Sequence, residues 1–177
     1  MEEKVARFEQ AVLPHLDAAY NLARWLTRND QDAEDVVQEA CLRAFKSFAS
    51  FRGGDGRPWL IAIVRNTCYT WMRQHRSREL ATPFDEEMHS VDSESCNPEA
   101  LLIRGADVKL LTKALEELPL EYREVLVLRE LEALSYKEIA EVADVPIGTV
   151  MSRLARARKR LQQSLTGTQR KEARLEL

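Results

Sequence analysis

The spacing of apolar residues constrains the fold of this chain more than any other feature of the sequence. Apolar side chains recur every three to four residues almost throughout, beginning with the series Phe8, Val12, Leu16, Ala19, Leu22 and Leu26. This step is the period of an α-helix that buries one face, whereas no useful length of alternating polar and apolar residues indicates a strand. The sequence therefore predicts an all-α protein.

Two stretches interrupt the helical period and divide the chain. The segment FRGGDGRP (51–58) holds three glycines and a proline, which predicts a loop. Residues 78–105 are acidic, contain several serines and are weakly periodic, which predicts a flexible linker. We therefore expect two small helical domains, residues 1–77 and 106–165, joined by this linker and followed by a tail at 166–177.

Several local signals define the expected helices. Asp30 or Asp32 is expected to cap the second helix of the first domain. Trp59 and Trp71 fit the apolar period after the glycine-rich loop, so both are predicted to belong to the core. In the second domain, Pro119 ends one helical run before another begins.

Composition excludes several functional classes. No apolar run approaches the roughly 18 residues that a membrane span requires, and the N-terminus lacks a signal-peptide core. The cysteines and histidines are isolated, with no spacing typical of a disulfide framework, a metal site or a catalytic triad: Cys41, Cys68, Cys96, His15, His75 and His89. We expect a cytoplasmic protein that does not insert into membranes, is not an enzyme, and has no metal, cofactor or small-molecule substrate.

Charge is distributed unevenly along this mildly acidic chain. Residues 52–78 hold six arginines and one acidic residue, and residues 146–177 hold eight basic and two acidic residues. By contrast, residues 78–105 hold two basic and seven acidic residues, and residues 106–145 hold five and ten. Two basic regions in an acidic chain predict two separate contacts with a polyanion.

The second basic region completes a helix-turn-helix pattern. SYKE (135–138) is a capping box, and a short helix, a turn at Asp144-Val145-Pro146 and a basic helix from about Ile147 to Gln162 follow it. On that last helix, an apolar stripe is predicted to pack on the preceding helices: Val150, Leu154, Ala157 and Leu161. Small residues and arginines occupy the other face, as a helix that enters a DNA groove requires.

At this point the sequence resembles a known family. SYKEIAEVADVPIGTVMSRLARARKRL resembles region 4.2 of bacterial extracytoplasmic-function (ECF) sigma factors, and ALEELPLEYREVLVLRELEALS resembles region 4.1. DAEDVVQEACLRAFKSFASF resembles region 2.2, and FRGGDGRPWLIAIVRNTCYTWMRQHR resembles regions 2.3 and 2.4. Two motif blocks in the family's order, separated by an acidic linker, make this resemblance specific.

The resemblance implies roles for named residues. The polymerase-binding residues would be Asp32, Asp35, Gln38 and Glu39, which form a mostly acidic ridge suited to a basic helical partner. Contacts to the −10 element would come from Arg65, Asn66, Thr70, Arg73 and Arg76. Contacts to the −35 element would come from Arg129, Thr149, Met151, Ser152, Arg153, Ala155, Arg156 and Lys159.

The chain departs from the family pattern at two of these positions. Many relatives carry Asp or Asn where Thr70 stands, and some carry Arg where Met151 stands, so base preference at both elements can differ. Arg153 is expected to contact either a phosphate or another part of the protein. The acidic linker is either a tether or a polyanion that threads a basic channel of the polymerase.

The expected function is that of an alternative sigma factor, which binds core RNA polymerase, recognises the −35 element and melts the −10 element of promoter DNA. An anti-sigma factor is a further expected partner. Two alternatives remain open: a stand-alone helix-turn-helix regulator, which would bind duplex DNA without the polymerase, and a sigma-like adaptor or decoy that binds an anti-sigma protein.

Overall fold

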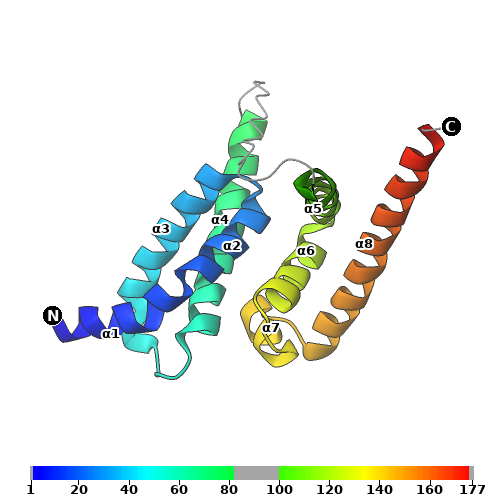
Figure 1. Ribbon diagram of the computed structural model, residues 1–177. Coiled ribbons are helices and arrows are strands. Elements are labelled where there is room, and N and C mark those ends of the chain that lie inside the picture. Colours follow the sequence, from blue (N-terminus) through cyan, green and yellow to red (C-terminus); the bar gives the residue numbers. More distant parts are fainter. Residues whose placement is uncertain (1, 82–99, 176–177) are drawn as a thin grey trace.

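The computed structural model describes residues 2–81 and 100–175, and all regular structure within these ranges is helical. Helices α1–α4 form an N-terminal unit and α5–α8 form a C-terminal unit, so the predicted all-α fold with two helical domains is confirmed (Figure 1). The linker expected at 78–105 lies mostly outside the described residues, since α4 extends to residue 81 and α5 begins at residue 100.

The N-terminal unit consists of α1 (Glu2–Val12), α2 (Leu16–Thr27), α3 (Asp30–Ser47) and α4 (Gly56–Ala81), with short 3₁₀ turns at Leu13–His15 and Phe48–Ser50. The first helical run is broken at Leu13–His15, where Pro14 lacks the N–H that would continue the α-helix. The cap of α3 is Asn29, not Asp30 or Asp32 as expected, because the Asn29 side chain accepts a hydrogen bond from the Asp32 N–H at 3.0 Å.

The loop before α4 is shorter than expected. Gly53 and Gly54 adopt positive φ angles of 84° and 88°, which glycine tolerates best. The helix nevertheless begins at Gly56, because proline is accepted in a first turn and the Asp55 side chain accepts a hydrogen bond from the Arg57 N–H at 2.9 Å. A Cβ at Gly56 would lie 2.2 Å from the carbonyl oxygen of Ala11, so only glycine permits this close packing of α4 against α1.

The C-terminal unit consists of α5 (Ala100–Glu116), α6 (Leu120–Leu126), a π-helical segment at Val127–Leu131, α7 (Tyr136–Ala143) and α8 (Ile147–Leu175). Pro119 separates α5 from α6, as predicted. Helix α8 continues beyond Gln162, where the sequence pattern ended it, because no proline interrupts the chain and helix interiors tolerate a single glycine such as Gly167.

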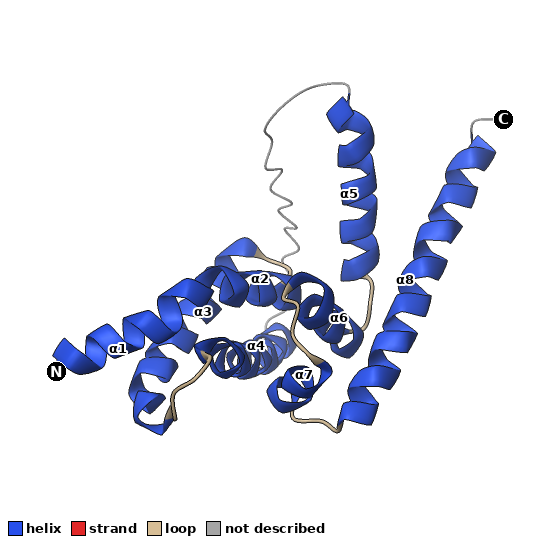
Figure 2. Ribbon diagram, turned by 60° about the horizontal axis from the view of Figure 1, so that its bottom comes forward, coloured by secondary structure: helices blue, strands red, loops and turns tan. Residues whose placement is uncertain are grey.

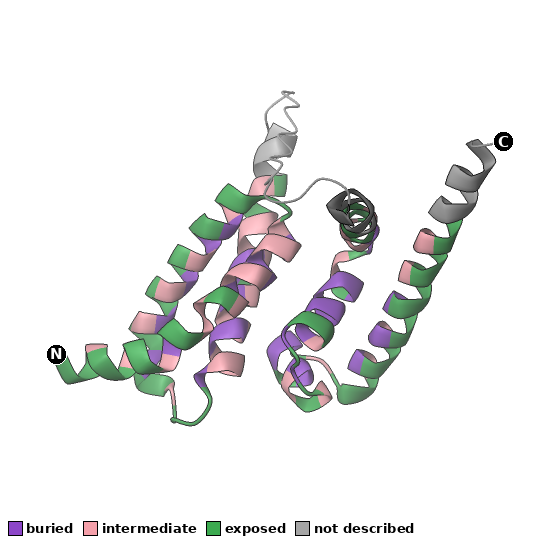
Figure 3. Ribbon diagram, in the orientation of Figure 1, coloured by how far each residue is buried: buried purple, intermediate pink, exposed green. Residues whose placement is uncertain are grey.

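The two units pack against each other. Helix α2 contacts α6, α4 contacts α7, and buried residues of both units belong to one hydrophobic cluster. Figure 2 shows α6 and α7 lying beside α2 and α4, while α8 lies on the far side of the C-terminal unit. Trp59 and Trp71 are half-buried and pack on this core, as predicted. Figure 3 shows that α8 is largely exposed on the side that faces away from the other helices. Among the described residues, no helix is both long and apolar enough to cross a membrane.

Candidate nucleic-acid interface

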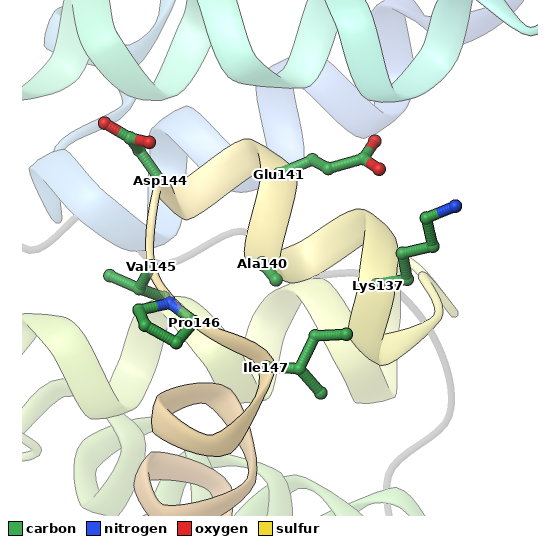
Figure 4. Close-up of a pocket in the computed structure, with 7 residues that line it drawn as sticks. All are labelled: Lys137, Ala140, Glu141, Asp144, Val145, Pro146 and Ile147. Atoms are coloured by element: carbon green, nitrogen blue, oxygen red, sulfur yellow. The ribbon is translucent and has the colours of Figure 1, made fainter.

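The helix-turn-helix is built as the sequence predicts. The Ser135 hydroxyl accepts a hydrogen bond from the Glu138 N–H at 3.2 Å, and the Glu138 carboxylate accepts one from the Ser135 N–H at 2.7 Å. Asp144 ends α7 in the left-handed conformation, at φ 53°. Figure 4 shows Asp144, Val145 and Pro146 in the turn that leads to Ile147, the first residue of α8. These local contacts fix the direction of α8 relative to α7.

Helix α8 has one face inside the protein and one outside. The predicted stripe of Val150, Leu154 and Ala157 is buried, and Leu161 is half-buried. Most of the residues predicted to contact the −35 element are exposed on the outward face: Met151, Ser152, Ala155, Arg156 and Lys159. The Ser152 hydroxyl donates to the Thr149 carbonyl oxygen at 3.0 Å, while its oxygen can still accept a hydrogen bond from a ligand. The outward face of α8 can therefore approach a DNA groove without rearrangement.

The other basic residues around α8 have partners within the C-terminal unit. Arg158 forms a 2.6 Å ion pair with Glu130, and Arg153 lies 3.8 Å from Glu121. The guanidinium of Arg129 donates to the Leu134 carbonyl oxygen at 2.8 Å and lies 5.0 Å from the ring centroid of Tyr136. Arg129 and Arg153 are half-buried. Arg129 thus fastens the loop before α7, whereas Arg156 lies on the exposed surface.

Helix α4 carries the residues predicted to contact the −10 element, and they do not share one environment. Asn66, Arg73 and Arg76 are exposed, while Thr70 is half-buried and its hydroxyl donates to the Asn66 carbonyl oxygen at 3.0 Å. Arg65 instead faces the C-terminal unit, where its side chain is only 15% exposed. Arg65 therefore differs from the other four in facing the C-terminal unit, although its guanidinium donates to the Asn66 side-chain oxygen at 3.3 Å.

Arg65 forms an ion pair with Glu124 of α6, whose side chain is 0% exposed. The Tyr69 hydroxyl donates to the other oxygen of the same carboxylate at 3.1 Å, and the Arg65 guanidinium lies 4.3 Å from the Tyr69 ring centroid. Burial and the negative charge of Glu124 together raise the pKa of Tyr69 to about 12. They also raise the pKa of the buried Cys68 thiol to about 12, which keeps this cysteine protonated and unreactive.

A second ion pair joins the units at Glu132. The Arg57 guanidinium contacts a carboxylate oxygen of Glu132 at 2.9 Å and donates to its carbonyl oxygen, and the Asn21 amide donates to the other carboxylate oxygen at 2.6 Å. Sequence reasoning did not single out Glu124 or Glu132. Glu124 stands with Arg123 between Tyr122 and the apolar run from Val125 to Leu128, and an acid beside such a run is a signal that could have identified it.

The acidic ridge lies on α3 and is mostly exposed. Asp35, Gln38 and Glu39 are exposed, whereas Asp32 is half-buried. Burial is the main cause that raises the pKa of Asp32, and nearby Asp35 adds to it. Helix α3 packs on α2 and α4 of its own unit. Asp35, Gln38 and Glu39 are exposed in this packed arrangement, so these three residues are accessible to a partner. Among the described residues, no group of three or more His, Cys, Asp or Glu side chains could hold a metal ion.

Comparison with protein-family models assigns both units. Residues 11–78 match the model described as Sigma-70 region 2, and residues 109–161 match the model described as Sigma-70, region 4. The two matches cover the α4 face, the α3 ridge and the helix-turn-helix.

Curated relatives agree with these matches. The chain is 34% identical to the ECF RNA polymerase sigma-E factor of Haemophilus influenzae, over 81% of this chain and 79% of the relative. It is 37% identical to the Escherichia coli K12 sigma-E factor, over 72% and 71%. It is also 37% identical to the sigma factor SigE of Mycolicibacterium smegmatis, over 89% of this chain but only 61% of that longer protein.

Two solved structures share the fold. The sigma factor RpoE in complex with the anti-sigma factor NepR, from Bartonella quintana, superposes with a TM-score of 0.71 at 30% identity, over 90% of this chain and 97% of RpoE. CnrH in complex with the cytosolic domain of CnrY superposes with a TM-score of 0.63 at 26% identity, over 90% and 88%.

Proposed function

Because the chain belongs to the extracytoplasmic-function family of RNA polymerase sigma factors, we propose that it binds core RNA polymerase and directs it to specific promoters. The observation that carries this proposal is the outward face of α8, where Ser152, Ala155 and Arg156 are exposed on a helix held in place by a capping box and a buried stripe. This face reads the −35 element in the major groove.

The other two surfaces supply the remaining steps. The α3 ridge of Asp35, Gln38 and Glu39 docks on a basic helical surface of the polymerase, with Asp32 at its half-buried end. Helix α4 contacts the −10 element through Asn66, Arg73 and Arg76 once the duplex opens, since amide and guanidinium groups suit flipped bases and phosphates. Arg129 and Arg153 support α8 from inside the unit, and Thr149 and Lys159 flank its reading face.

The role is one of binding rather than catalysis, and it belongs in the cytoplasm, where RNA polymerase transcribes DNA. The structural relatives RpoE and CnrH are complexed with NepR and with the cytosolic domain of CnrY, respectively. We therefore propose an anti-sigma protein as a further partner of this chain.

Transcription with purified components tests the proposal. The chain and core polymerase are combined with a library of genomic promoter fragments, and new transcript starts are mapped. A sigma factor redirects initiation to a defined set of promoters. A set of starts that does not change when the chain is added would contradict the proposal.

A gel shift separates this function from its alternatives. A stand-alone regulator binds duplex promoter DNA without polymerase, and an adaptor or decoy binds an anti-sigma protein without supporting transcription. The proposed sigma factor gives a specific, stable shift only together with core polymerase.

A further inference from the structure

The outward face of α8 carries a line of apolar residues beside its polar ones. Met151 is 53% exposed, and Ile147, four residues earlier, is 45% exposed. Ala155, four residues after Met151, is exposed as well. Residues four positions apart lie one above the other on a helix, so Ile147, Met151 and Ala155 form one line, which we call the apolar strip.

The apolar strip runs directly beside the polar residues proposed to read the −35 element. Ser152 follows Met151 and Arg156 follows Ala155, and both polar residues are exposed. Gly148, one turn before Ser152, adds no side chain, and a Cβ at this position would meet no atom within 4 Å. A ligand can therefore approach α8 closely here, and one that contacts Ser152 also meets Met151.

The packing of α8 does not require an apolar side chain at Met151. Val150, Leu154 and Ala157 are the buried residues that join this helix to its own unit, and Met151 points away from them. Single exposed apolar side chains are common on proteins, so exposure alone identifies no ligand. What distinguishes Met151 is its place within a face that otherwise suits base edges.

The chemistry of the major groove decides what the apolar strip can recognise. Base edges there present hydrogen-bond donors and acceptors and a single kind of apolar group, the C5-methyl of thymine. Methionine has no donor and only a weakly accepting sulfur, so Met151 cannot read the polar groups. Its unbranched, flexible side chain can instead cover a methyl group.

We propose that Met151 selects a thymine in the −35 element by burying its C5-methyl group. Ile147 and Ala155 extend the apolar surface on either side of it. This uncharged readout adds to the hydrogen bonds of Ser152 and Arg156, whereas an arginine in place of Met151 would favour a guanine. The inference rests on the proposed function, since it assumes that α8 enters the major groove of a promoter.

Removal of single methyl groups from the DNA tests the proposal. Holoenzyme is assembled from core polymerase and the full-length chain and is bound to a promoter found by the transcription assay. Each thymine of the −35 element, on either strand, is replaced in turn by deoxyuridine, which lacks only the methyl group. Gel shifts compare the unmodified chain with Met151→Ala, Arg156→Ala and the matched control Arg158→Ala, whose arginine is exposed on α8 but paired with Glu130.

The preference for the methyl group should depend on Met151 and not on the arginines. At one thymine, the unmodified chain should bind the deoxyuridine promoter about fourfold more weakly, because one methyl group is no longer buried. Met151→Ala should bind the two promoters equally. Arg156→Ala should bind both more weakly with the fourfold ratio intact, and Arg158→Ala should also keep the ratio. Raising the salt concentration should lower every affinity but leave the ratio unchanged, since the methyl group is uncharged.

The opposite results are equally clear. Insensitivity of the unmodified chain to deoxyuridine at every thymine would overturn the proposal, and so would a fourfold loss that persists in Met151→Ala. A ratio that falls with salt would assign the preference to charged contacts instead. Met151→Ala truncates an exposed side chain and should keep the fold, which circular dichroism checks. Absence of any shift with the unmodified chain and unmodified promoter would refute the proposed function, and this inference with it.

Discussion

Helices α4 and α8 both carry arginines proposed to contact DNA, but the protein treats them differently. Arg156 on α8 is exposed, whereas Arg65 on α4 is mostly buried and paired with Glu124. The two basic regions look alike in the sequence, because each combines several arginines with few acids. The difference shows that the packing of the two units, and not the local sequence, decides which of these arginines is exposed.

The largest expected effect is a difference in the free energy of unfolding between two single variants, one at Arg65 and one at Arg156. Arg65→Ala leaves the buried Glu124 carboxylate without its cation and should lower the free energy of unfolding of the closed chain by about 3 kcal/mol. Arg156→Ala removes an exposed side chain and should change it by less than about 0.5 kcal/mol. Urea denaturation measures both. Equal stability of the two variants would remove the contrast between the helices.

Promoter binding should distinguish two exposed arginines of α8, Arg156 and Arg158. Arg156→Ala should weaken binding of the holoenzyme to its promoter by about 2 kcal/mol, because a base or phosphate contact is lost. Arg158→Ala is the matched control, since Arg158 is already paired with Glu130 and should have a smaller effect. Gel shifts at fixed salt measure the difference. A holoenzyme that carries Arg156→Ala and binds like the wild type would exclude Arg156 from the interface.

The titration of Tyr69 reports on the closed interface. Burial and Glu124 raise its pKa to about 12, above the value of about 10 expected in the unfolded chain. The neutral phenol therefore contributes stability that is complete below pH of about 10 and is lost as the pH rises towards 12. Ultraviolet absorbance of tyrosinate measures the titration, and Tyr69→Phe identifies the signal. In Glu124→Gln the pKa should move back towards 10; a Tyr69 signal near 10 in the unmodified chain would contradict the closed packing.

The smallest effect is expected at Ala133, in the loop before α7. Ala133 has a positive φ of 52° and lies between Glu132 and Leu134, whose carbonyl oxygens accept hydrogen bonds from Arg57 and Arg129. Ala133→Gly should relieve this strain and stabilise the chain by about 0.5–1 kcal/mol. Gly53→Ala, which introduces strain at a φ of 84°, is the opposite control. Thermal melting of both variants checks the sign, and a destabilised Ala133→Gly would show that the turn is not strained.

Short-range features of this protein could be predicted from its sequence. The capping box at Ser135 and the stripe from Val150 to Ala157 depend on residues a few positions apart, and both are present in the structure. The cap of α3 was misassigned because Asn29 stands one residue before two plausible acids. The start of α4 was missed because Gly56 is required by contact with Ala11, which lies 45 positions earlier.

The candidate site could be predicted only in part, for the same reason. The outward face of α8 follows from helical periodicity alone, and the exposed part of the α3 ridge does as well. The pairing of Arg65 with Glu124 joins residues 59 positions apart, and that of Arg57 with Glu132 joins residues 75 positions apart. No local pattern encodes such contacts, because they depend on how the two units pack.

The distance between the two units tests most directly the packing that separates buried Arg65 from exposed Arg156. Spin labels at Glu9→Cys and Gln162→Cys, both exposed and in different units, can be introduced into a chain without its native cysteines. Pulsed electron paramagnetic resonance is then recorded for the free chain. The account predicts one narrow distance, because contacts of α2 with α6 and of α4 with α7 hold the two units together. A broad distribution of distances would contradict it.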